Sequence, residues 1–174
     1  MVIDIGCGKR KQEPNSIGLD LSSDSAADAL CNLNQLPWPV RDNAATKIYL
    51  SHVIEHLEDV MGAMREIHRI ARPGARVHIV TPHFSSHNSY TDPTHRRHLT
   101  SESFQYFTGE PFERFAGARC RFRILEVSLT FGHSFLLDGL GRLLAALSLR
   151  WYEKHAAWIF PAQDIRCTLE AVKD

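Results

Sequence analysis

VIDIGCGKRK, residues 2–11, joins a short run of branched apolar residues to a turn with two glycines. The run is typical of a buried strand, and Asp4 stands at its end. Gly6 and Gly8 permit positive φ and let a ligand approach the backbone closely. A tight strand exit without a ligand is the alternative interpretation, because a lone G-x-G pattern often occurs by chance.

A second acidic residue favours the ligand. Asp20 ends the next apolar run, SIGLD, and ligands of open α/β sheets bind beyond the carboxyl ends of strands, where a carboxylate can accept both ribose hydroxyls. Asp4, the glycine turn and Asp20 together predict a nucleoside site. A dinucleotide fingerprint needs a third glycine where this chain has Lys11, so an NAD-binding enzyme is the weaker alternative.

Further short apolar runs predict a parallel sheet. They are rich in branched residues and bounded by glycine, proline or charge. Between the third and fourth runs, LEDVMGAMREIHRIARPG (57–74) has apolar residues at helical spacing up to Pro73-Gly74. This strand, helix, strand order forms a right-handed crossover, so the class is α/β. The runs are MVIDI (1–5), SIGLDL (16–21), KIYLSHVI (47–54), ARVHIVT (75–81) and RFRILEVSL (121–129).

The second half of the chain adds helices and a last strand. TSESFQYF (100–107) predicts a short helix capped by Thr100, with Glu102 near the positive end of its dipole. Residues 134–160 are helical in composition and strongly apolar, and they form an insertion or cap that ends before Pro161. DIRCTLEAV (164–172) predicts a final antiparallel strand at or near a sheet edge. No repeat or linker divides residues 1–174, so we expect one domain.

Composition excludes several classes of protein. The formal net charge is zero, so nucleic acid is not the expected partner. No apolar run reaches the roughly 18 residues of a membrane span, and no secretion signal stands at the start. The cysteines are scattered without C-x-x-C spacing, so they suggest a reducing, cytoplasmic environment and no zinc knuckle. These are Cys7, Cys31, Cys120 and Cys167.

Several sequence blocks, in this order, resemble the class I S-adenosylmethionine-dependent methyltransferases, particularly the small type 11 group. The resemblance covers nearly the whole chain. It implies a Rossmann-like, mostly parallel seven-stranded sheet with an antiparallel last strand, preceded here by the helical insertion. It also implies S-adenosylmethionine as cofactor and S-adenosylhomocysteine as product. The blocks are DIGCG (4–8), GLDLS (18–22), NLNQLPWP (32–39), YLSHVIEHLEDV (49–60) and EIHRIARPGARVHIVTPH (66–83).

The resemblance assigns cofactor-binding residues. Asp4 would support the glycine turn, and Asp20 would hold the ribose. The remaining residues would lie against the methionine moiety (Gly6, Cys7, Gly8), against the adenine (Leu21, Asn32, Leu33) and beside the sulfonium (Ser51, His52). Asn32 departs from the family, which commonly has aspartate there. An amide carbonyl accepts the same hydrogen bond without charge assistance.

Two other departures concern helices. The segment between Asp4 and Asp20 is short and contains Pro14, so the usual helix after the glycine loop must be shortened or replaced by a basic loop. The chain also begins almost at its first strand, where relatives often carry a helix over the cofactor. With Asn32, these departures support the alternative of a non-catalytic module that binds S-adenosylmethionine or S-adenosylhomocysteine.

The histidine-rich segment TPHFSSHNSYTDPTHRRH (81–98) follows the fifth strand of the resemblance, so we expect a substrate lid over the cofactor's methyl group. The substrate-binding candidates are His83, Phe84, Tyr90 and Arg96. A zinc or iron cage and an exposed polar loop are the alternatives. We predict no metal, because the spacing matches no compact signature and methyl transfer needs no Lewis acid. The cage would use His83, His87, Asp92, His95 and His98.

The segment also resembles one in bacterial methyltransferases of this group, some of which occur with surface-polysaccharide enzymes. This resemblance implies a hydroxyl or amine acceptor on a small molecule or glycan precursor. In-line methyl transfer depends on proximity and orientation and is helped by a base near neutral pKa. The candidate base is His52 or His95, with Asp92 able to orient an imidazole. Glu55-His56 could brace the site.

The apolar segment 135–160 leaves several partners open. Trp151, Tyr152 and Trp158 would cover the sheet or form a homodimer seam. Alternatively they would cap a lipid-linked substrate or rest on a membrane surface, where nearby basic residues would suit anionic lipids. These basic residues are Arg142, Arg150 and Lys154.

Overall fold

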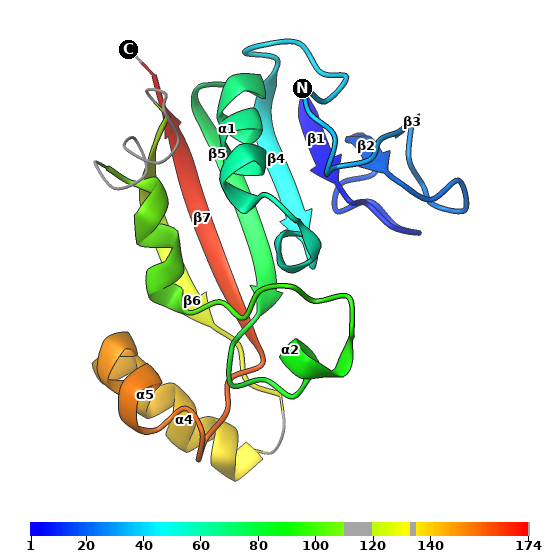
Figure 1. The fold of residues 1–174 in the computed structure, drawn as a ribbon. Helices are drawn as coiled ribbons and strands as arrows, with labels where there is room; N and C mark the ends of the chain where they lie inside the picture. The colour runs from blue at the N-terminus through cyan, green and yellow to red at the C-terminus, as the bar shows by residue number, and fades with distance from the viewer. Residues whose placement is uncertain (110–119, 133–134, 174) are drawn as a thin grey trace.

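The computed structural model describes residues 1–109, 120–132 and 135–173. Its centre is one seven-stranded sheet in the order β3-β2-β1-β4-β5-β7-β6 (Figure 1). Strands β1 to β5 pair in parallel, and β7 pairs antiparallel with β5 and β6. The predicted fold class is therefore confirmed. The strands are Val2–Ile5 (β1), Ile17–Asp20 (β2), Ala29–Leu30 (β3), Ala45–Ser51 (β4), Ala71–Pro82 (β5), Arg121–Leu129 (β6) and Asp164–Val172 (β7).

The helices are short and lie mainly in the second half of the chain. Asp59 caps α1 by accepting a hydrogen bond from the Gly62 backbone, and Thr100 forms a capping box with Ser103 at η2, as its sequence predicts. Ser148 divides the apolar segment into α4 and α5. The bounds are Ile54–His56 (η1), Val60–Ile70 (α1), Asn88–Thr91 (α2), Ser101–Phe107 (η2), Phe135–Leu147 (α4) and Leu149–His155 (α5).

One predicted boundary is wrong. Helix α1 ends at Ile70 and β5 starts at the next residue, so Pro73-Gly74 lie inside the strand and do not end the helix. The prediction of a final antiparallel strand at or near a sheet edge is confirmed, because β7 lies next to the edge strand β6. A basic loop replaces the usual helix after the glycine turn, as one of the two predicted outcomes, because residues 6–16 contain no helix.

The core lies between the sheet and α1, which covers the face that is turned to the viewer in Figure 1. Met64, Ile67 and Ile70 of α1 are fully buried, as are the inward residues of the central strands. Burial then alternates along β5 and β7, as in a sheet with one dry face. The residues of the other face are half-exposed or exposed and mostly polar, and include Arg76, His78, Arg166, Thr168 and Glu170.

The glycine turn is built by backbone geometry. Gly6 and Gly8 have φ of 66° and 54°, the left-handed region in which other residues are strained. The Gly6 and Cys7 amides donate to the Leu19 carbonyl, and the buried Asp4 carboxylate accepts from the Gln12 amide at 2.6 Å. Asp4 therefore supports the turn.

Gly6→Ala should destabilise the fold by about 2–5 kcal/mol, because it adds backbone strain to steric overlap. A Cβ at Gly6 would lie 2.3 Å from Val53 Cγ2. The control is Gly74→Ala, which has a similar φ of 76° but nothing within 4 Å of its added Cβ and should cost only about 1–2 kcal/mol. Urea unfolding measures both, and equal losses would contradict the overlap with Val53.

Candidate active site

The carboxyl ends of β1 and β2 form a cradle. Asp20 joins them, because its Oδ2 accepts from the Gly8 amide at 2.8 Å and its Oδ1 accepts from the Ser22 amide at 2.9 Å. A Cβ at Gly8 would meet nothing within 4 Å, so space lies open over this turn. A half-buried carboxylate beside an open glycine turn suits a nucleoside with its attached chain.

The three residues expected around an adenine differ in exposure and in their hydrogen bonds. Leu21 is 69% exposed beside Asp20, where a flat ring could cover it. Leu33 is half-buried, and its carbonyl accepts from the indole of Trp38. Asn32 Oδ1 accepts from the Asn34 amide at 3.1 Å, so the oxygen expected to serve an adenine already closes a turn. Burial raises the pKa of Cys7, which keeps its thiol protonated.

Strand β4 ends in a second left-handed turn. His52 follows Ser51 with φ of 55°, and its amide donates to the Val80 carbonyl of β5. Its side chain is 48% exposed, and its Nδ1 lies 3.4 Å from Glu55 Oε1. Contact with this carboxylate raises the pKa of His52 against the opposing effect of burial.

Glu55 is the centre of this turn, although its sequence suggested only a bracing role. It is 1% exposed, its Oε2 accepts from Thr81 Oγ1 at 3.0 Å, and its backbone carbonyl accepts from the Arg96 amide at 2.8 Å. Its Oε1 lies 4.0 Å from His95 Nε2. One acidic residue thus ties the ends of β4 and β5 to the histidine-rich segment.

A pocket of about 550 Å³ opens beside this turn. Its lining residues come from the turn after β4, the end of β5 and the α2 segment, and Figure 1 shows the α2 segment beyond the carboxyl ends of the two strands. The pocket brings together the three predicted catalytic residues, His52, Asp92 and His95, and is completed by Pro82, Asn88, Thr91 and Pro93.

Comparison with known proteins identifies the fold and the family. The family described as "Methyltransferase domain" matches residues 1–119. The chain belongs to this family. It is a class I methyltransferase, and its cofactor is S-adenosylmethionine, so the nicotinamide alternative is set aside. No curated protein matches the chain.

Solved structures show the same fold at low identity. The [4+2]-cyclase SpnF is 18% identical over 99% of this chain and 74% of its own, with a TM-score of 0.63. The YcgJ protein from Bacillus subtilis is 15% identical over 99% and 92%, with a TM-score of 0.63. An S-adenosylmethionine-dependent methyltransferase from Mesorhizobium loti is 15% identical over 97% and 89%, with a TM-score of 0.59.

The structure buries His83, which the sequence predicted to contact the substrate. His83 is fully buried, with Nδ1 2.7 Å from Ser85 Oγ and Nε2 3.2 Å from Glu153 Oε1. Glu153 Oε1 also accepts from the Ser101 amide at 2.7 Å. In this arrangement His83 cannot touch a substrate, and it instead joins the end of β5 to α5.

The other expected substrate contacts lie at the surface or against neighbours. Phe84 packs edge-on against Trp158, with ring centroids 5.3 Å apart, and Tyr90 stacks on His98 at 4.2 Å. Arg96 pairs with Glu58 at 2.9 Å. The five-residue metal cage does not assemble. Among the described side chains, His95 alone of those five joins a cluster of metal-ligand type, and its companions there are Glu55 and His56.

Asp92 is linked by hydrogen bonds to His56, an imidazole that was not expected to be its partner. Its Oδ1 accepts from the Thr94 hydroxyl at 2.6 Å and from the Thr94 amide at 2.8 Å, and these hydrogen bonds lower the pKa of Asp92. The Thr94 hydroxyl in turn contacts His56 Nδ1 at 2.9 Å. Asp92 therefore orients His56 through Thr94, whereas the expectation was His52 or His95.

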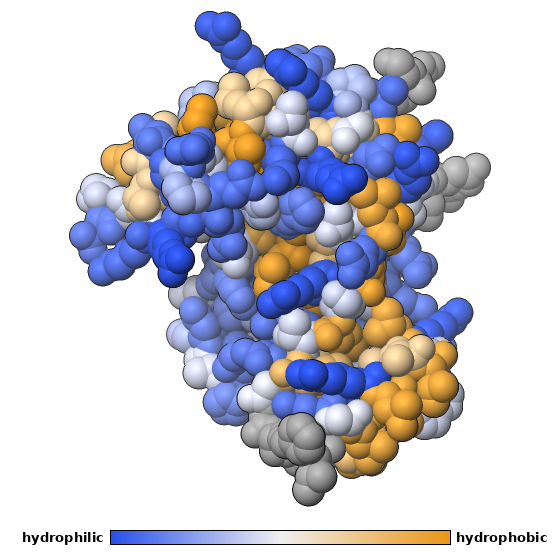
Figure 2. Space-filling model, turned by 180° about the vertical axis from the view of Figure 1, so that it is seen from behind, coloured by the Kyte–Doolittle hydropathy of each residue, from blue (hydrophilic) through white to orange (hydrophobic). Residues whose placement is uncertain are grey.

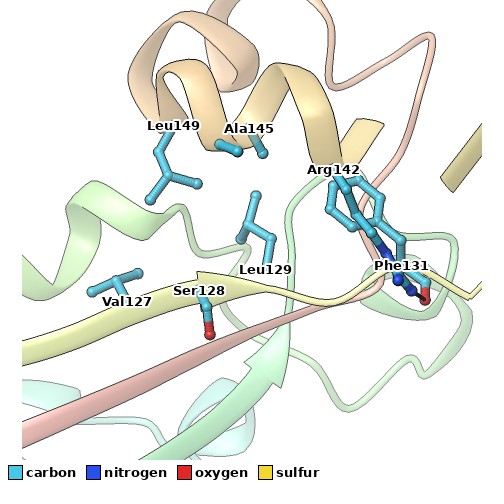
Figure 3. Close-up of a pocket in the computed structure, with 8 residues that line it drawn as sticks. Val127, Ser128, Leu129, Phe131, Arg142, Ala145 and Leu149 are labelled. Carbon is cyan, nitrogen blue, oxygen red and sulfur yellow. Dashed lines mark hydrogen bonds between the residues drawn. The ribbon is translucent and has the colours of Figure 1, made fainter. Parts of the chain in front are cut away.

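The apolar segment forms a surface of its own. Figure 2 shows apolar side chains gathered over α4, α5 and the turn that follows α5. Among the described side chains there, the most exposed are Leu143, Leu147, Trp151, Trp158 and Ile159. Beneath them, a cavity of about 470 Å³ lies between these helices and β6, and Arg142 Nη2 reaches the Phe131 carbonyl at its rim (Figure 3). No described helix is long and apolar enough to cross a bilayer. A homodimer seam, a lipid-linked substrate and a membrane contact stay predictions for this surface.

Glu153→Gln should lower the free energy of unfolding by about 1–3 kcal/mol near neutral pH, because it weakens buried hydrogen bonds to a charged group. Burial raises the pKa of Glu153, but hydrogen bonds from His83 and Ser101 outweigh it and hold the pKa below the ordinary 4.5. The stabilisation is therefore present above pH 4.5 and is lost as the pH falls through the folded-state pKa.

Urea unfolding at pH 7 and at pH 3 measures this difference. Glu102→Gln is the control, because Glu102 pairs at the surface with Arg150 at 3.3 Å and should matter little. A difference between the wild type and Glu153→Gln that stays constant across this pH range would contradict an ionised, hydrogen-bonded Glu153.

Proposed function

We propose that this methyltransferase acts on a hydroxyl or amine of a small molecule or glycan precursor that binds in the pocket beside His52. The observation that carries the proposal is the convergence of His52, Asp92 and His95 on one open pocket at the end of β4, next to the glycine cradle. A pocket of about 550 Å³ suits a small molecule or one sugar. The zero formal charge argues against nucleic acid as the acceptor.

The cradle fits the cofactor. Asp20 would take the ribose hydroxyls, and the open space over Gly8 would receive the methionine chain. Leu21 would cover the adenine, with Asn32 and Leu33 at its edge. Asp4, Gly6 and Cys7 shape the turn, while Ser51 stands at the end of β4. When bound, S-adenosylmethionine supplies an electrophilic methyl group.

His52 is the proposed base. Its side chain is half-exposed to the pocket, whereas His95 is held by a contact of Nδ1 with the Ser89 carbonyl. His52 Nδ1 faces Glu55, so Nε2 takes the proton of the acceptor and the buried carboxylate stabilises the imidazolium that forms. Phe84, Tyr90 and Arg96 are proposed to border the acceptor. His95 and Asp92 position the pocket wall.

Asp20→Ala should weaken S-adenosylmethionine binding by about 10–100-fold, because it removes hydrogen bonds to a charged acceptor and frees the Gly8 amide. Isothermal titration with S-adenosylmethionine and S-adenosylhomocysteine measures this loss. Asp24→Ala is the matched control, because Asp24 lies in the same loop and pairs at the surface with Lys9. Equal affinities in both variants would show that the cofactor does not lie on Asp20.

His52→Gln should lower kcat by about 10²–10⁴-fold and change cofactor affinity far less, because it removes a proton acceptor but retains a polar side chain. A panel of sugars, phenols and amines with labelled S-adenosylmethionine identifies the acceptor first. His155→Gln, on the distant helix α5, is the control. Cofactor binding with no transfer to any acceptor would favour the non-catalytic alternative, and an unchanged kcat would exclude His52 as the base.

A further inference from the structure

Three ligand-type side chains meet at the wall of the acceptor pocket. Glu55 and His56 come from the turn after β4, and His95 comes from the loop after α2. Their ligand atoms all lie within 4.8 Å of one another, and the two imidazoles meet edge to face with centroids 4.6 Å apart. Neither ring is fully exposed. Residues far apart in the sequence thus form one cluster that the sequence pattern did not predict.

The carboxylate in this cluster has an unsatisfied oxygen. Glu55 Oε1 is buried and has no hydrogen-bond partner among the described residues, although Oε2 is bonded to Thr81. His52 Nδ1 at 3.4 Å and His95 Nε2 at 4.0 Å are the nearby nitrogens. A buried carboxylate oxygen without a hydrogen-bond donor is unfavourable. A cation beside Oε1 would remove that cost.

The tautomer of His56 is fixed by its neighbours. The Thr94 hydroxyl donates its single hydrogen to Asp92 Oδ1 at 2.6 Å. The same oxygen therefore accepts from His56 Nδ1 at 2.9 Å, so Nδ1 carries the proton. In the neutral ring, Nε2 is then left with a free lone pair.

The tautomer of His95 is fixed by its neighbours as well. Its Nδ1 lies 3.2 Å from the Ser89 backbone carbonyl, which can only accept, so Nδ1 carries the proton. Its Nε2 lone pair then faces Glu55 Oε1 at 4.0 Å, which is too long for a direct hydrogen bond. Histidines that bind metals commonly donate their second N–H to a carbonyl or to a carboxylate-linked group, and both rings do so here.

We propose that Glu55 Oε1 and the Nε2 atoms of His56 and His95 bind a divalent first-row transition-metal ion, of the Zn²⁺, Fe²⁺ or Mn²⁺ kind. Two imidazoles and one carboxylate suit these ions. Ligand atoms about 2.1 Å from a metal stand roughly 3–4 Å apart, and one ligand atom of each of the three residues already lies within 4.8 Å of the others. This site differs from the cage considered from the sequence and departs from the expectation of no metal.

The ion has a direct consequence for the acceptor. His95 lines the pocket, so the site borders the space assigned to the substrate. Three protein ligands leave a position for a substrate oxygen, and an ion lowers the pKa of a hydroxyl bound to it. The acceptor class is therefore a hydroxyl rather than an amine, and this narrower assignment rests on the proposed function.

The charges around the cluster agree with a bound cation. Arg96 and Arg97 follow His95, but Arg96 pairs with the Glu58 carboxylate and Arg97 donates to the Glu58 carbonyl. Each guanidinium therefore has an oxygen partner outside the cluster. The acidic Asp92 stands behind His56 through Thr94, so the second nitrogen of that imidazole contacts a carboxylate-linked hydroxyl.

Titration of the chelator-treated chain with Co²⁺ tests the site by visible absorption, and titration with Zn²⁺ tests it by calorimetry. One ion should bind per chain. His56→Gln and His95→Gln should each weaken binding at least about 100-fold, and Thr94→Val, which frees the His56 tautomer, by about 10–100-fold. His87→Gln is the matched control, because His87 is an exposed histidine of the same segment with its Nδ1 on Thr91.

Titration of every variant with S-adenosylhomocysteine separates this inference from the proposed function and confirms folding. Loss of metal in His56→Gln and His95→Gln, with cofactor binding retained, supports the site. The inference is overturned if the wild type binds no ion, or if His56→Gln and His87→Gln bind equally well. Metal binding that persists while the wild type fails to bind S-adenosylhomocysteine would instead overturn the proposed function.

Discussion

The contact between the exits of β1 and β4 constrains everything built at this edge of the sheet. Ile5 pairs with Leu50, and one step later Gly6 turns away with its α-carbon against Val53. Because no side chain fits between them, the glycine turn and the turn that carries His52 are held side by side. This packing therefore places the turn proposed to hold the cofactor next to the turn proposed to face the acceptor.

The buried residue Glu55 connects the segments around the proposed acceptor pocket. It contacts Thr81 through its side chain and Arg96 through its backbone, so the ends of β4 and β5 and the following loop share one residue. A charge in such a place is stable only when positive groups or donors surround it. His52 Nδ1 is the nitrogen that lies near this carboxylate, at 3.4 Å, so the position of its imidazole depends on Glu55.

Much of the fold could be read from local pattern, whereas the site could be read only in part. The run at 121–129 has the observed strand bounds, but the two-residue β3 is too short for any periodicity. The position of Asp20 at the carboxyl end of β2 was predictable from the apolar run that it ends, whereas its contact with a ribose stays a proposal. His83 was misassigned because a histidine's sequence neighbours do not reveal burial against Glu153. The role of Glu55 depends on segments that meet only after folding.

One face of the sheet packs against the core and the other faces outward, so the two faces should tolerate amino-acid substitutions differently. Along β5, Val77 and Ile79 are enclosed by the core, while Arg76 and His78 face outward. Side-chain volume is therefore constrained at the positions that face the core and is hardly constrained at those that face outward. A saturation library of this strand would show tolerance with a period of two, so that charge and solubility can be redesigned on one face without disturbing the packing that positions the site.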